Sequence, residues 1–437
     1  MKTKQSGGKV SVVTLGCSKN LVDSENIITQ LRNGRLEAEH ELQDAEVDSV
    51  IVNTCGFIEA AKQESIDTIL HYVDLKGQGV IKKLYVTGCL SQRYKDDLQR
   101  EIPEVDAYFG TMELAPLLAR FNVDYRHELL GERSIMTPPH YAYLKISEGC
   151  NRTCAFCAIP LMRGGHRSRT IEQILQEAQN LVAKGVKEIL LIAQELTYYG
   201  LDLYKSRKLG ELLEQLAGIE GLEWIRLHYA YPSKFPRDVL EVMARHPNIC
   251  NYLDMPLQHG SDSVLSRMKR QITVAETRDL IRYARETVPQ LSLRTTMLVG
   301  FPGETESEFR ELCEFVREMK FNRLGVFEYS HEEGTSSATL KDNVPRRVKE
   351  ERAGKLMEIQ RQISLEHNEA LVGSTLRVMI DRKEGKNFFG RTEYDSPEVD
   401  NEVIIDAESD YVRIGDIARV EITDATEYDL YAKVVKQ

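Results

Sequence analysis

The feature that most constrains the fold of this chain is a repeated alternation of short apolar runs with segments of helical periodicity. In the first part of the chain, the apolar runs typical of strands are Val10–Cys17, Ser49–Cys55, Lys83–Cys89 and Asp106–Gly110. The segments between them place apolar residues every three or four positions, as helices do. This alternation predicts βαβ units and a parallel sheet. We therefore expect an open parallel α/β sheet domain over residues 8–125.

The alternation resumes after a proline-containing stretch, residues 131–140. Six further strand candidates, separated by helical patterns, are Tyr141–Ile146, Glu188–Ala193, Trp224–Ala230, Tyr252–Leu257, Ser292–Val299 and Arg323–Tyr329. Six βα units are fewer than the eight that close a full barrel. We therefore expect an open, partial (β/α)6 barrel over residues 136–370, with a site at the carboxyl ends of its strands.

The last part of the chain, residues 373–437, has short alternating runs separated by turn residues, which predicts a small all-β barrel of the oligonucleotide-binding type. From Ser374 onward there are 9 Lys and Arg against 15 Asp and Glu, so this part holds −6 of the chain's formal charge of −11. Such a charge repels phosphate backbones and attracts a basic protein. The candidates for this attraction are Glu393, Asp395, Glu398, Asp400 and Glu402; the alternative is a solubilising face.

Two features predict a cytoplasmic protein. No window approaches the roughly 18 apolar residues of a membrane-spanning helix, and residues 1–10 lack the apolar core of a signal peptide. Eight cysteines in a reducing compartment are not expected to form disulfides. Two of them, Cys250 and Cys313, stand apart from the others and are expected to be small buried side chains.

Three of the remaining cysteines, Cys17, Cys55 and Cys89, each fall at the carboxyl end of a predicted strand, about one βα unit apart. Ligands of open parallel sheets bind at the carboxyl edge. Three thiols at this edge could share one ligand, and small or turn-type residues flank each of them. The alternative is three unrelated cysteines at strand ends.

The other three, Cys150, Cys154 and Cys157, form a Cys-x-x-x-Cys-x-x-Cys run directly after a predicted strand. Thiolates are the ligands of iron–sulfur clusters, and three of them leave one iron of a four-iron cubane open to another ligand. Structural zinc sites usually contain two Cys-x-x-Cys pairs or added histidines. The one nearby histidine, His166, follows a Gly-Gly pair and belongs to no ligand-spaced set. An iron–sulfur cluster is therefore favoured over zinc.

This run resembles the signature of radical S-adenosylmethionine (radical SAM) enzymes, and nearly the whole chain resembles the methylthiotransferases of that superfamily. The motifs that carry the resemblance are Gly16-Cys17, Asn53-Thr54-Cys55-Gly56-Phe57, Thr87-Gly88-Cys89, Ile159-Pro160 with Arg163-Gly164, Pro256-Leu257-Gln258-His259 and Gly300-Phe301-Pro302-Gly303-Glu304. The terminal barrel resembles the TRAM domain of RNA-modifying enzymes. The string from Leu15 to Glu25 resembles the branch that modifies a ribosomal protein, because the transfer-RNA branch has Gly-Cys-Gln-Met-Asn where this chain has Gly-Cys-Ser-Lys-Asn.

The resemblance implies two 4Fe-4S clusters, a radical-generating one on Cys150, Cys154 and Cys157 and an auxiliary, sulfur-carrying one on Cys17, Cys55 and Cys89. It also implies that two S-adenosylmethionine molecules per turnover convert an aspartate of small-subunit ribosomal protein twelve to 3-methylthioaspartate. An electron donor such as flavodoxin or ferredoxin would be a partner. Weaker candidates for cofactor binding are Gln194, Glu195, where the family has an aspartate, Gly300 and Gly303. Lys145 and Arg163 flank the cluster loop and could pair with carboxylates, although most such charges face solvent.

Two other functions stay open from the sequence. The same chemistry could act on adenosine in transfer RNA, or the chain could be a non-catalytic iron–sulfur or zinc scaffold that binds ribosomes. A scaffold would form no deoxyadenosine from S-adenosylmethionine, which separates it from both enzymes.

Overall fold

The computed structural model describes residues 8–42, 47–126, 129, 131–408 and 411–435, so most of the N-terminal segment discussed above lies outside the described residues. The chain divides into two compact units. Unit 1 consists of Met1–Thr137, Tyr143–Asn151 and Ala158–Leu181. Unit 2 consists of Pro138–Ala142, Arg152–Cys157 and Val182–Gln437.

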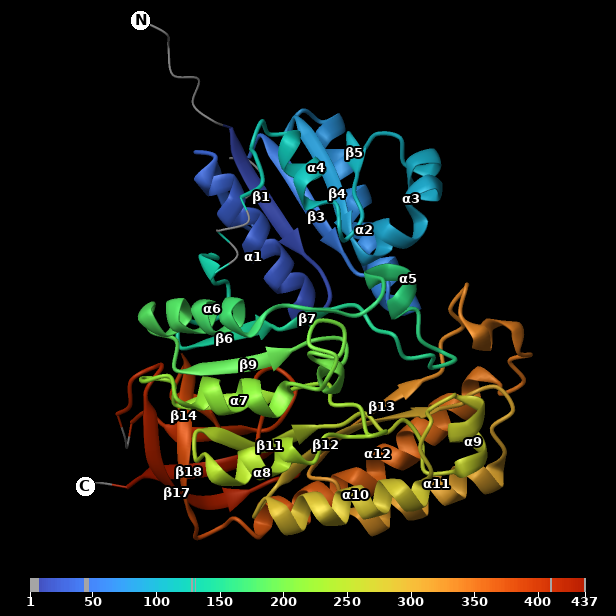
Figure 1. Cartoon of the computed structure of the whole chain (residues 1–437), viewed down its shortest axis with the longest axis vertical. Helices are drawn as coiled ribbons and strands as arrows, with labels where there is room; N and C mark the ends of the chain where they lie inside the picture. Colours follow the sequence, from blue (N-terminus) through green and yellow to red (C-terminus); the bar gives the residue numbers. More distant parts are fainter. Residues whose placement is uncertain (1–7, 43–46, 127–128, 130, 409–410, 436–437) are drawn as a thin grey trace, which may run out of the picture. The chain divides into compact units, whose positions relative to one another are not determined.

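Unit 1 contains a five-stranded parallel sheet of order β2-β1-β3-β4-β5 (Figure 1). Its strands are β1 (Lys9–Thr14), β2 (Glu37–His40), β3 (Ser49–Thr54), β4 (Lys83–Gly88) and β5 (Ala107–Tyr108). The open parallel sheet is confirmed, with one strand more than the pattern predicts. The additional strand, β2, lies at the sheet edge and buries only Ala38. It therefore contains no apolar run from which a strand could be predicted.

Helices cover both faces of this sheet, as parallel sheets require. On one face, Val10 and Val12 of β1 pack against α1 (Ser18–Asn33) and α4 (Leu114–Ala119). On the other face, Val50 and Val52 of β3 pack against α2 (Glu59–Gly77) and α3 (Cys89–Glu101). The remaining elements of this unit are β7 (Ser147–Glu148), α5 (Ile159–Arg163), β8 (Arg167–Ser168) and α6 (Ile171–Ala183).

The six strands predicted for the central part form one sheet of order β13-β12-β11-β10-β9-β6. They are β6 (Tyr141–Lys145), β9 (Glu188–Ile192), β10 (Trp224–Leu227), β11 (Ile249–Asp254), β12 (Ser292–Val299) and β13 (Arg323–Glu328). Strands β9 to β13 run parallel, so their carboxyl ends share one edge. The helices of unit 2 are η3 (Leu196–Tyr198), α7 (Leu209–Ala217), α8 (Asp238–Arg245), α9 (Asp262–Arg267), α10 (Val274–Thr287), α11 (Glu306–Met319), η4 (Ser336–Thr339) and α12 (Arg346–Glu369). The expectation of a partial α/β barrel is confirmed.

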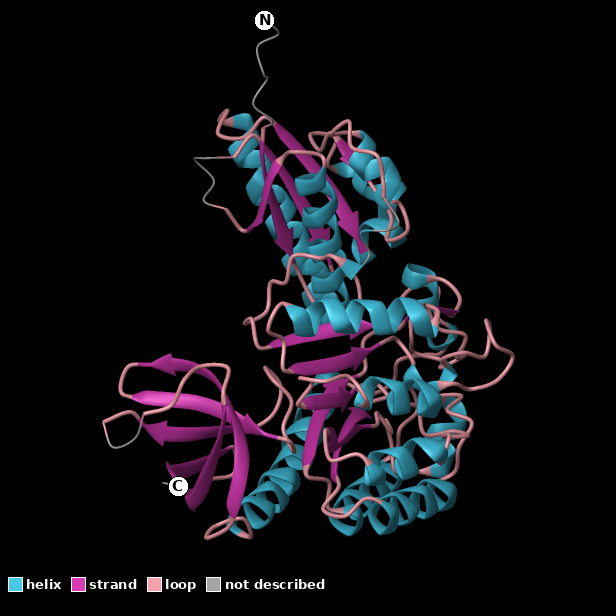
Figure 2. Ribbon diagram, turned by 60° about the vertical axis from the view of Figure 1, so that its left-hand side comes forward, coloured by secondary structure: helices cyan, strands magenta, loops and turns pink. Residues whose placement is uncertain are grey.

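The last part of unit 2 is the expected small closed barrel, whose strands are magenta in Figure 2. The strand order is β14-β15-β16-β18-β17. Its strands are β14 (Thr375–Glu384), β15 (Asn387–Thr392), β16 (Glu402–Asp406), β17 (Ile417–Ala425) and β18 (Asp429–Val434). Alternate residues of each strand point inward, for example Val378 and Ile380 of β14 and Val403 and Ile405 of β16. This period of two is the pattern from which the strands are predicted.

Within unit 2, a buried cluster of charges joins the barrel to the first residues of the parallel strands. Glu188, at the start of β9, accepts a hydrogen bond from Arg226 Nε at 2.8 Å and forms an ion pair with Arg391 of the barrel. All three side chains are at most 2% exposed. Around them, the apolar side chains of Trp224, Cys250, Tyr252 and Met379 pack together.

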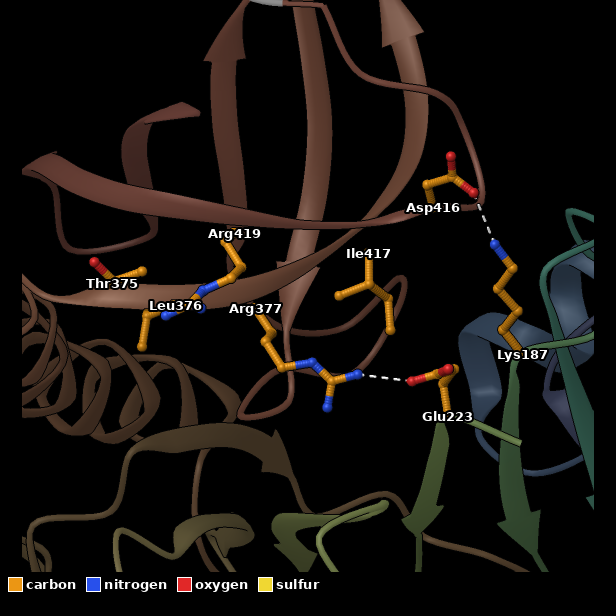
Figure 3. A pocket seen from close by; sticks show the side chains of 8 residues that line it. All are labelled: Lys187, Glu223, Thr375, Leu376, Arg377, Asp416, Ile417 and Arg419. Atoms are coloured by element: carbon orange, nitrogen blue, oxygen red, sulfur yellow. Dashed lines mark hydrogen bonds and ion pairs between the residues drawn. The ribbon is translucent and has the colours of Figure 1, made fainter. Parts of the chain in front are cut away.

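The rim of this junction is solvated. Figure 3 shows the ion pairs Lys187–Asp416 and Arg377–Glu223, both at 2.8 Å. They border a groove of about 650 Å³ that no cysteine lines. No helix in the described parts of the chain has the length and apolar character needed to cross a membrane.

We predict that Glu188→Gln destabilises unit 2 by about 3–5 kcal/mol, because it removes the carboxylate that pairs with buried Arg226 and leaves Arg391 with Asp381 alone. The matched control is Glu223→Gln, which removes an exposed ion pair at the same junction and should cost at most about 1 kcal/mol. Urea unfolding of the two variants measures the difference. Equal losses of stability would contradict the role assigned to Glu188.

Candidate functional site

Cys17, Cys55 and Cys89 lie at the carboxyl ends of three adjacent strands of unit 1. Cys17 is the N-cap residue of α1 after β1, Cys55 directly follows β3, and Cys89 is the first residue of α3 after β4. Because β1 pairs with β3 and β3 pairs with β4, these three strand ends are neighbours on one sheet edge. Cys17 is exposed, whereas Cys55 and Cys89 are buried.

Glycines next to these cysteines allow the chain segments to approach one another. Gly16 has φ +91°, and a Cβ atom there would lie 2.8 Å from Cys55 Sγ. Gly88 has φ +100°, and its Cβ would lie 2.4 Å from the carbonyl oxygen of Thr54. Both positions therefore require glycine, for backbone conformation and for space.

Hydrogen bonds hold the Cys17 and Cys55 loops in place. Asn20 Nδ2 donates to the carbonyl oxygens of Leu15 and Thr54, at 2.7 and 3.0 Å, which joins the Cys17 loop to the end of β3. Ser65 Oγ accepts from the Cys55 amide at 3.0 Å and donates to the Cys55 carbonyl at 2.9 Å. The positions of these loops are thus determined by the protein fold itself.

Burial favours the neutral thiols of Cys55 and Cys89 until a cation binds. Burial raises the pKa of Cys89 to about 11, although the nearby Arg163 guanidinium opposes the shift. Burial also raises the pKa of Cys55. Because metals bind thiolates, metal binding here must displace protons.

The second triplet lies on the loop between β7 and α5, which passes from unit 1 to unit 2 after Asn151. In unit 1, the Cys150 amide donates to the Gly164 carbonyl at 3.1 Å. The preceding Gly149 has φ +77°, and a Cβ atom there would lie 2.2 Å from the Gly165 carbonyl oxygen. The backbone before Cys150 therefore packs too closely to carry a side chain.

In unit 2, Cys154 and Cys157 belong to a tight turn in which the Cys157 amide donates to the Cys154 carbonyl at 3.2 Å. Between them, Ala155 donates to the Met268 carbonyl at 2.9 Å and accepts from the Ser337 amide at 2.8 Å. Backbone hydrogen bonds to two distant segments therefore fix the turn that presents the two sulfur atoms.

An aromatic and cationic cluster adjoins this turn in unit 2. The Arg152 guanidinium lies between the rings of Tyr198 and Tyr231, with its Cζ 3.9 and 3.8 Å from their centroids. Arg152 also donates to Glu195 Oε2 at 3.2 Å, and Glu195 in turn accepts from the Thr197 amide at 2.7 Å. Glu195 is among the residues predicted from the sequence, whereas Arg152 and Tyr231 are not, although the position of Arg152 inside the cysteine run is a usable signal.

The other weak candidates lie at the carboxyl edge of the same sheet, after β9 and β12. Gln194 follows β9 and is partly buried. Gly300 and Gly303 follow β12 with φ +74° and +79°, and their amides donate to Glu304 and Asn343. A Cβ on Gly300 would lie 2.3 Å from Lys349 Cγ, so packing alone requires glycine there.

Lys145 and Arg163 do not face solvent. In unit 1, Lys145 Nζ donates to Glu148 Oε2 at 2.7 Å and also to Asp23. Arg163, whose side chain is 4% exposed, donates from Nη1 to Asp23 Oδ2 at 2.6 Å. Lys145 and Arg163 therefore pair with carboxylates, whereas most charges of this kind were expected to face solvent.

The expectation of an acidic docking face on the terminal barrel is wrong for two of its residues. The five carboxylates proposed for it were Glu393, Asp395, Glu398, Asp400 and Glu402. Asp395 is buried in an ion pair with Arg323 at 2.6 Å, and the Asp400 carboxylate, 1% exposed, pairs with Arg294 at 3.2 Å. These two bind the barrel to the parallel sheet within unit 2, because buried arginines need counter-charges. Glu402 pairs with Arg382, and Glu398 is exposed.

Cys250 and Cys313 are buried, as expected for small apolar side chains. Within the described residues, no three His, Cys, Asp or Glu side chains converge on one metal-ion position. A cubane does not need such convergence, because each thiolate binds a different iron atom.

Three family profiles match the chain. They are described as the radical SAM superfamily, over residues 144–316, an uncharacterized protein family, UPF0004, over residues 9–110, and the TRAM domain, over residues 372–435.

Curated relatives match the chain over nearly its full length. Those from Cytophaga hutchinsonii and Christiangramia forsetii are each named ribosomal protein uS12 methylthiotransferase RimO. The protein from Cytophaga hutchinsonii is 59% identical, with 98% of each chain covered. The protein from Christiangramia forsetii is 57% identical, covering 99% of this chain and 96% of the relative.

Solved structures share the fold at low identity. The radical S-adenosylmethionine methyltransferase TsrM from Kitasatospora setae matches with TM-score 0.56 and 13% identity, covering 88% of this chain and 81% of TsrM. The cobalamin-dependent radical enzyme OxsB matches with TM-score 0.51 and 13% identity, covering 82% of this chain and 56% of OxsB.

We predict that Gly16→Ala destabilises unit 1 more than Gly79→Ala does. Both glycines have left-handed backbone, but a Cβ at Gly79 has no atom within 4 Å, whereas at Gly16 it would overlap Cys55 Sγ. The control variant should cost only the backbone strain, about 1–2 kcal/mol. Thermal unfolding of both variants measures the difference, and similar losses would show that the close approach of Gly16 to Cys55 is unimportant.

Proposed function

The chain belongs to the RimO family of ribosomal protein uS12 methylthiotransferases, which are radical SAM enzymes, and on that premise we propose that it converts an aspartate of uS12 to 3-methylthioaspartate. The observation that carries the proposal is the presence of two separate thiol triplets. One lies at the carboxyl edge of β1, β3 and β4, and the other lies on the loop after β7.

The reaction explains why such cofactors are needed. The β-carbon of an aspartate carries an unactivated C–H bond that no side-chain base can usefully deprotonate. When bound, an iron–sulfur cluster with S-adenosylmethionine supplies a radical able to remove that hydrogen atom. Cys17, Cys55 and Cys89 would hold a second cluster, which would supply the sulfur.

We assign the two clusters to the two triplets. Cys150, Cys154 and Cys157 would hold the radical-generating cluster, and Cys17, Cys55 and Cys89 the auxiliary one. Both sets fit a cubane, because each offers three soft thiol ligands on segments that glycines and backbone hydrogen bonds hold in place. Three thiol ligands rather than four would leave one iron of each cluster open to another ligand.

The residues around the second triplet have supporting roles in this proposal. Arg152, stacked between two tyrosine rings and paired with Glu195, would keep the cluster loop ordered at the carboxyl edge of the sheet. Glu195, Gln194, Gly300 and Gly303 occupy the ends of β9 and β12, where S-adenosylmethionine would lie.

The partners follow from the reaction. The substrate is uS12, free or in the small ribosomal subunit, and the electron comes from a small carrier such as flavodoxin or ferredoxin. Because the substrate is a ribosomal protein, we place the enzyme in the cytoplasm.

The cofactor assignment predicts that anaerobically reconstituted protein carries about eight irons per chain, as two four-iron cubanes. Replacing Cys150, Cys154 and Cys157 with alanine should remove about half of the iron and abolish deoxyadenosine formation. Replacing Cys17, Cys55 and Cys89 should remove the other half and leave deoxyadenosine formation partly intact. The matched control is the double variant Cys250→Ala with Cys313→Ala, which should keep all the iron. About four irons in the wild type, unchanged by the N-terminal replacements, would refute the two-cluster assignment.

The substrate assignment predicts a modification that disappears with the gene. Mass spectrometry of uS12 from cells without this gene should show an unmodified aspartate where cells with the gene carry a methylthio group. Bulk transfer RNA from the same cells should be unchanged. Loss of methylthio groups from transfer-RNA adenosine, with uS12 unaltered, would support the alternative substrate instead.

A further inference from the structure

Each cysteine triplet contains one sulfur atom that accepts an N–H group from a buried arginine. Arg163 Nε lies 3.3 Å from Cys89 Sγ, within unit 1. Arg270 Nη1 lies 3.3 Å from Cys154 Sγ, within unit 2. Both arginines are 4% exposed. Neither arginine comes from the loop that carries its cysteine. The two triplets therefore have the same kind of arginine–sulfur hydrogen bond, formed by different parts of the chain.

We propose that Arg163 and Arg270 are positioning residues that hold the thiolates of Cys89 and Cys154 and raise the reduction potentials of the two clusters. The inference rests on the proposed ligation of clusters by the two triplets. Reduction adds a negative charge to a cluster and its sulfur ligands. A nearby N–H donor and positive charge stabilise the reduced form, and hydrogen bonds to the ligand sulfurs are among the factors that set cluster potentials.

Arg163 is held so that its Nε faces the sulfur. Its Nη1 donates to Asp23 Oδ2 at 2.6 Å and its Nη2 donates to Asn20 Oδ1, which leaves Nε for Cys89. The planar guanidinium cannot make all three contacts in another orientation. Asn20 also anchors the Cys17 loop and the end of β3, so Arg163 is fixed to the frame that carries the other two cysteines.

The positive charge of Arg163 is largely neutralised by its surroundings. Asp23 is shared with Lys145, and Lys145 also binds Glu148, two residues before Cys150. Two cations and two carboxylates thus balance in this network. What Cys89 receives from Arg163 is therefore mainly a directed hydrogen bond rather than a net charge.

Arg270 is held differently. Its Nη2 donates to the Pro256 carbonyl, and its Cζ lies 4.1 Å from the centroid of the Tyr231 ring. The Tyr231 hydroxyl donates to the Arg270 carbonyl at 2.7 Å and lies 3.6 Å from Cys154 Sγ. Among the described residues, no carboxylate forms an ion pair with Arg270, so the charge beside Cys154 is not cancelled. Its loss should therefore shift the potential more than the loss of Arg163.

The test is a redox titration of each cluster, followed by electron paramagnetic resonance in full-length reconstituted protein. To separate the signals, each arginine variant is made in a chain whose other triplet is replaced by alanine. Arg163→Gln and Arg270→Gln should each lower the potential of the adjacent cluster. We expect about a tenfold change in the ratio of reduced to oxidised cluster, equivalent to about 59 mV for one electron, and a larger change for Arg270.

Matched controls remove the same charge from a side chain that contacts no cysteine sulfur in the described residues. Arg167→Gln and Lys269→Gln lie four residues and one residue away, are exposed, and should leave both potentials unchanged. Asp23→Asn keeps Arg163 but removes a counter-charge, so it should shift the auxiliary potential in the opposite, positive direction. This variant also keeps the test informative if Arg163→Gln does not fold.

Iron content distinguishes a failure of the proposed cluster ligation from a failure of the proposed role of the arginines. About four irons in the wild type would refute the proposed cluster ligation itself. Two full clusters whose potentials do not respond to Arg163→Gln, Arg270→Gln or Asp23→Asn would refute only the role of the arginines, as would equal shifts in the exposed controls. Arg163→Lys, which keeps the charge without the planar fork, should restore the potential only in part.

Discussion

The parallel pairing of β1, β3 and β4 is the constraint on which the proposed chemistry depends. Parallel strands must all end at the same edge, so a cysteine after each strand is brought to the others without any long-range sequence signal. The glycines before Cys17 and Cys89 then allow the loops to pack together. A simple repeat of the chain thereby assembles three ligands from widely separated positions.

Buried arginines join segments that are not paired with each other in the sheets. In unit 1, Arg133 binds both Glu25 and Glu177, all nearly inaccessible to solvent. In unit 2, the Glu188 carboxylate is shared by Arg226 of the sheet and Arg391 of the barrel. Removing one member of such a group leaves a buried charge unpaired, which is far more costly than losing a surface ion pair. These contacts therefore determine where the loops and the terminal barrel lie within each unit.

The sequence was sufficient for the architecture because hydrophobic periodicity is a local signal. All six central strands and four of the five N-terminal strands were predicted from it, whereas β2, with one buried residue, had no such signal. The partners of charged residues could not be predicted, because they depend on tertiary contacts. Asp395 and Asp400 looked like surface charges but neutralise Arg323 and Arg294, and Arg163 was noticed only as a flanking charge. Arg270 and Tyr231 belong to no cysteine motif and were missed.

The central claim is that two differently placed thiol triplets serve one reaction on a protein substrate. Its most direct test is incubation of reconstituted enzyme, a reductant and methyl-labelled S-adenosylmethionine with purified small ribosomal subunits. The account predicts that the label appears in a methylthio group on one aspartate of uS12. It also predicts that alanine at Cys17, Cys55 and Cys89 abolishes this labelling while deoxyadenosine still forms. Labelled aspartate produced by that triple variant, or label found only in RNA, would contradict the account.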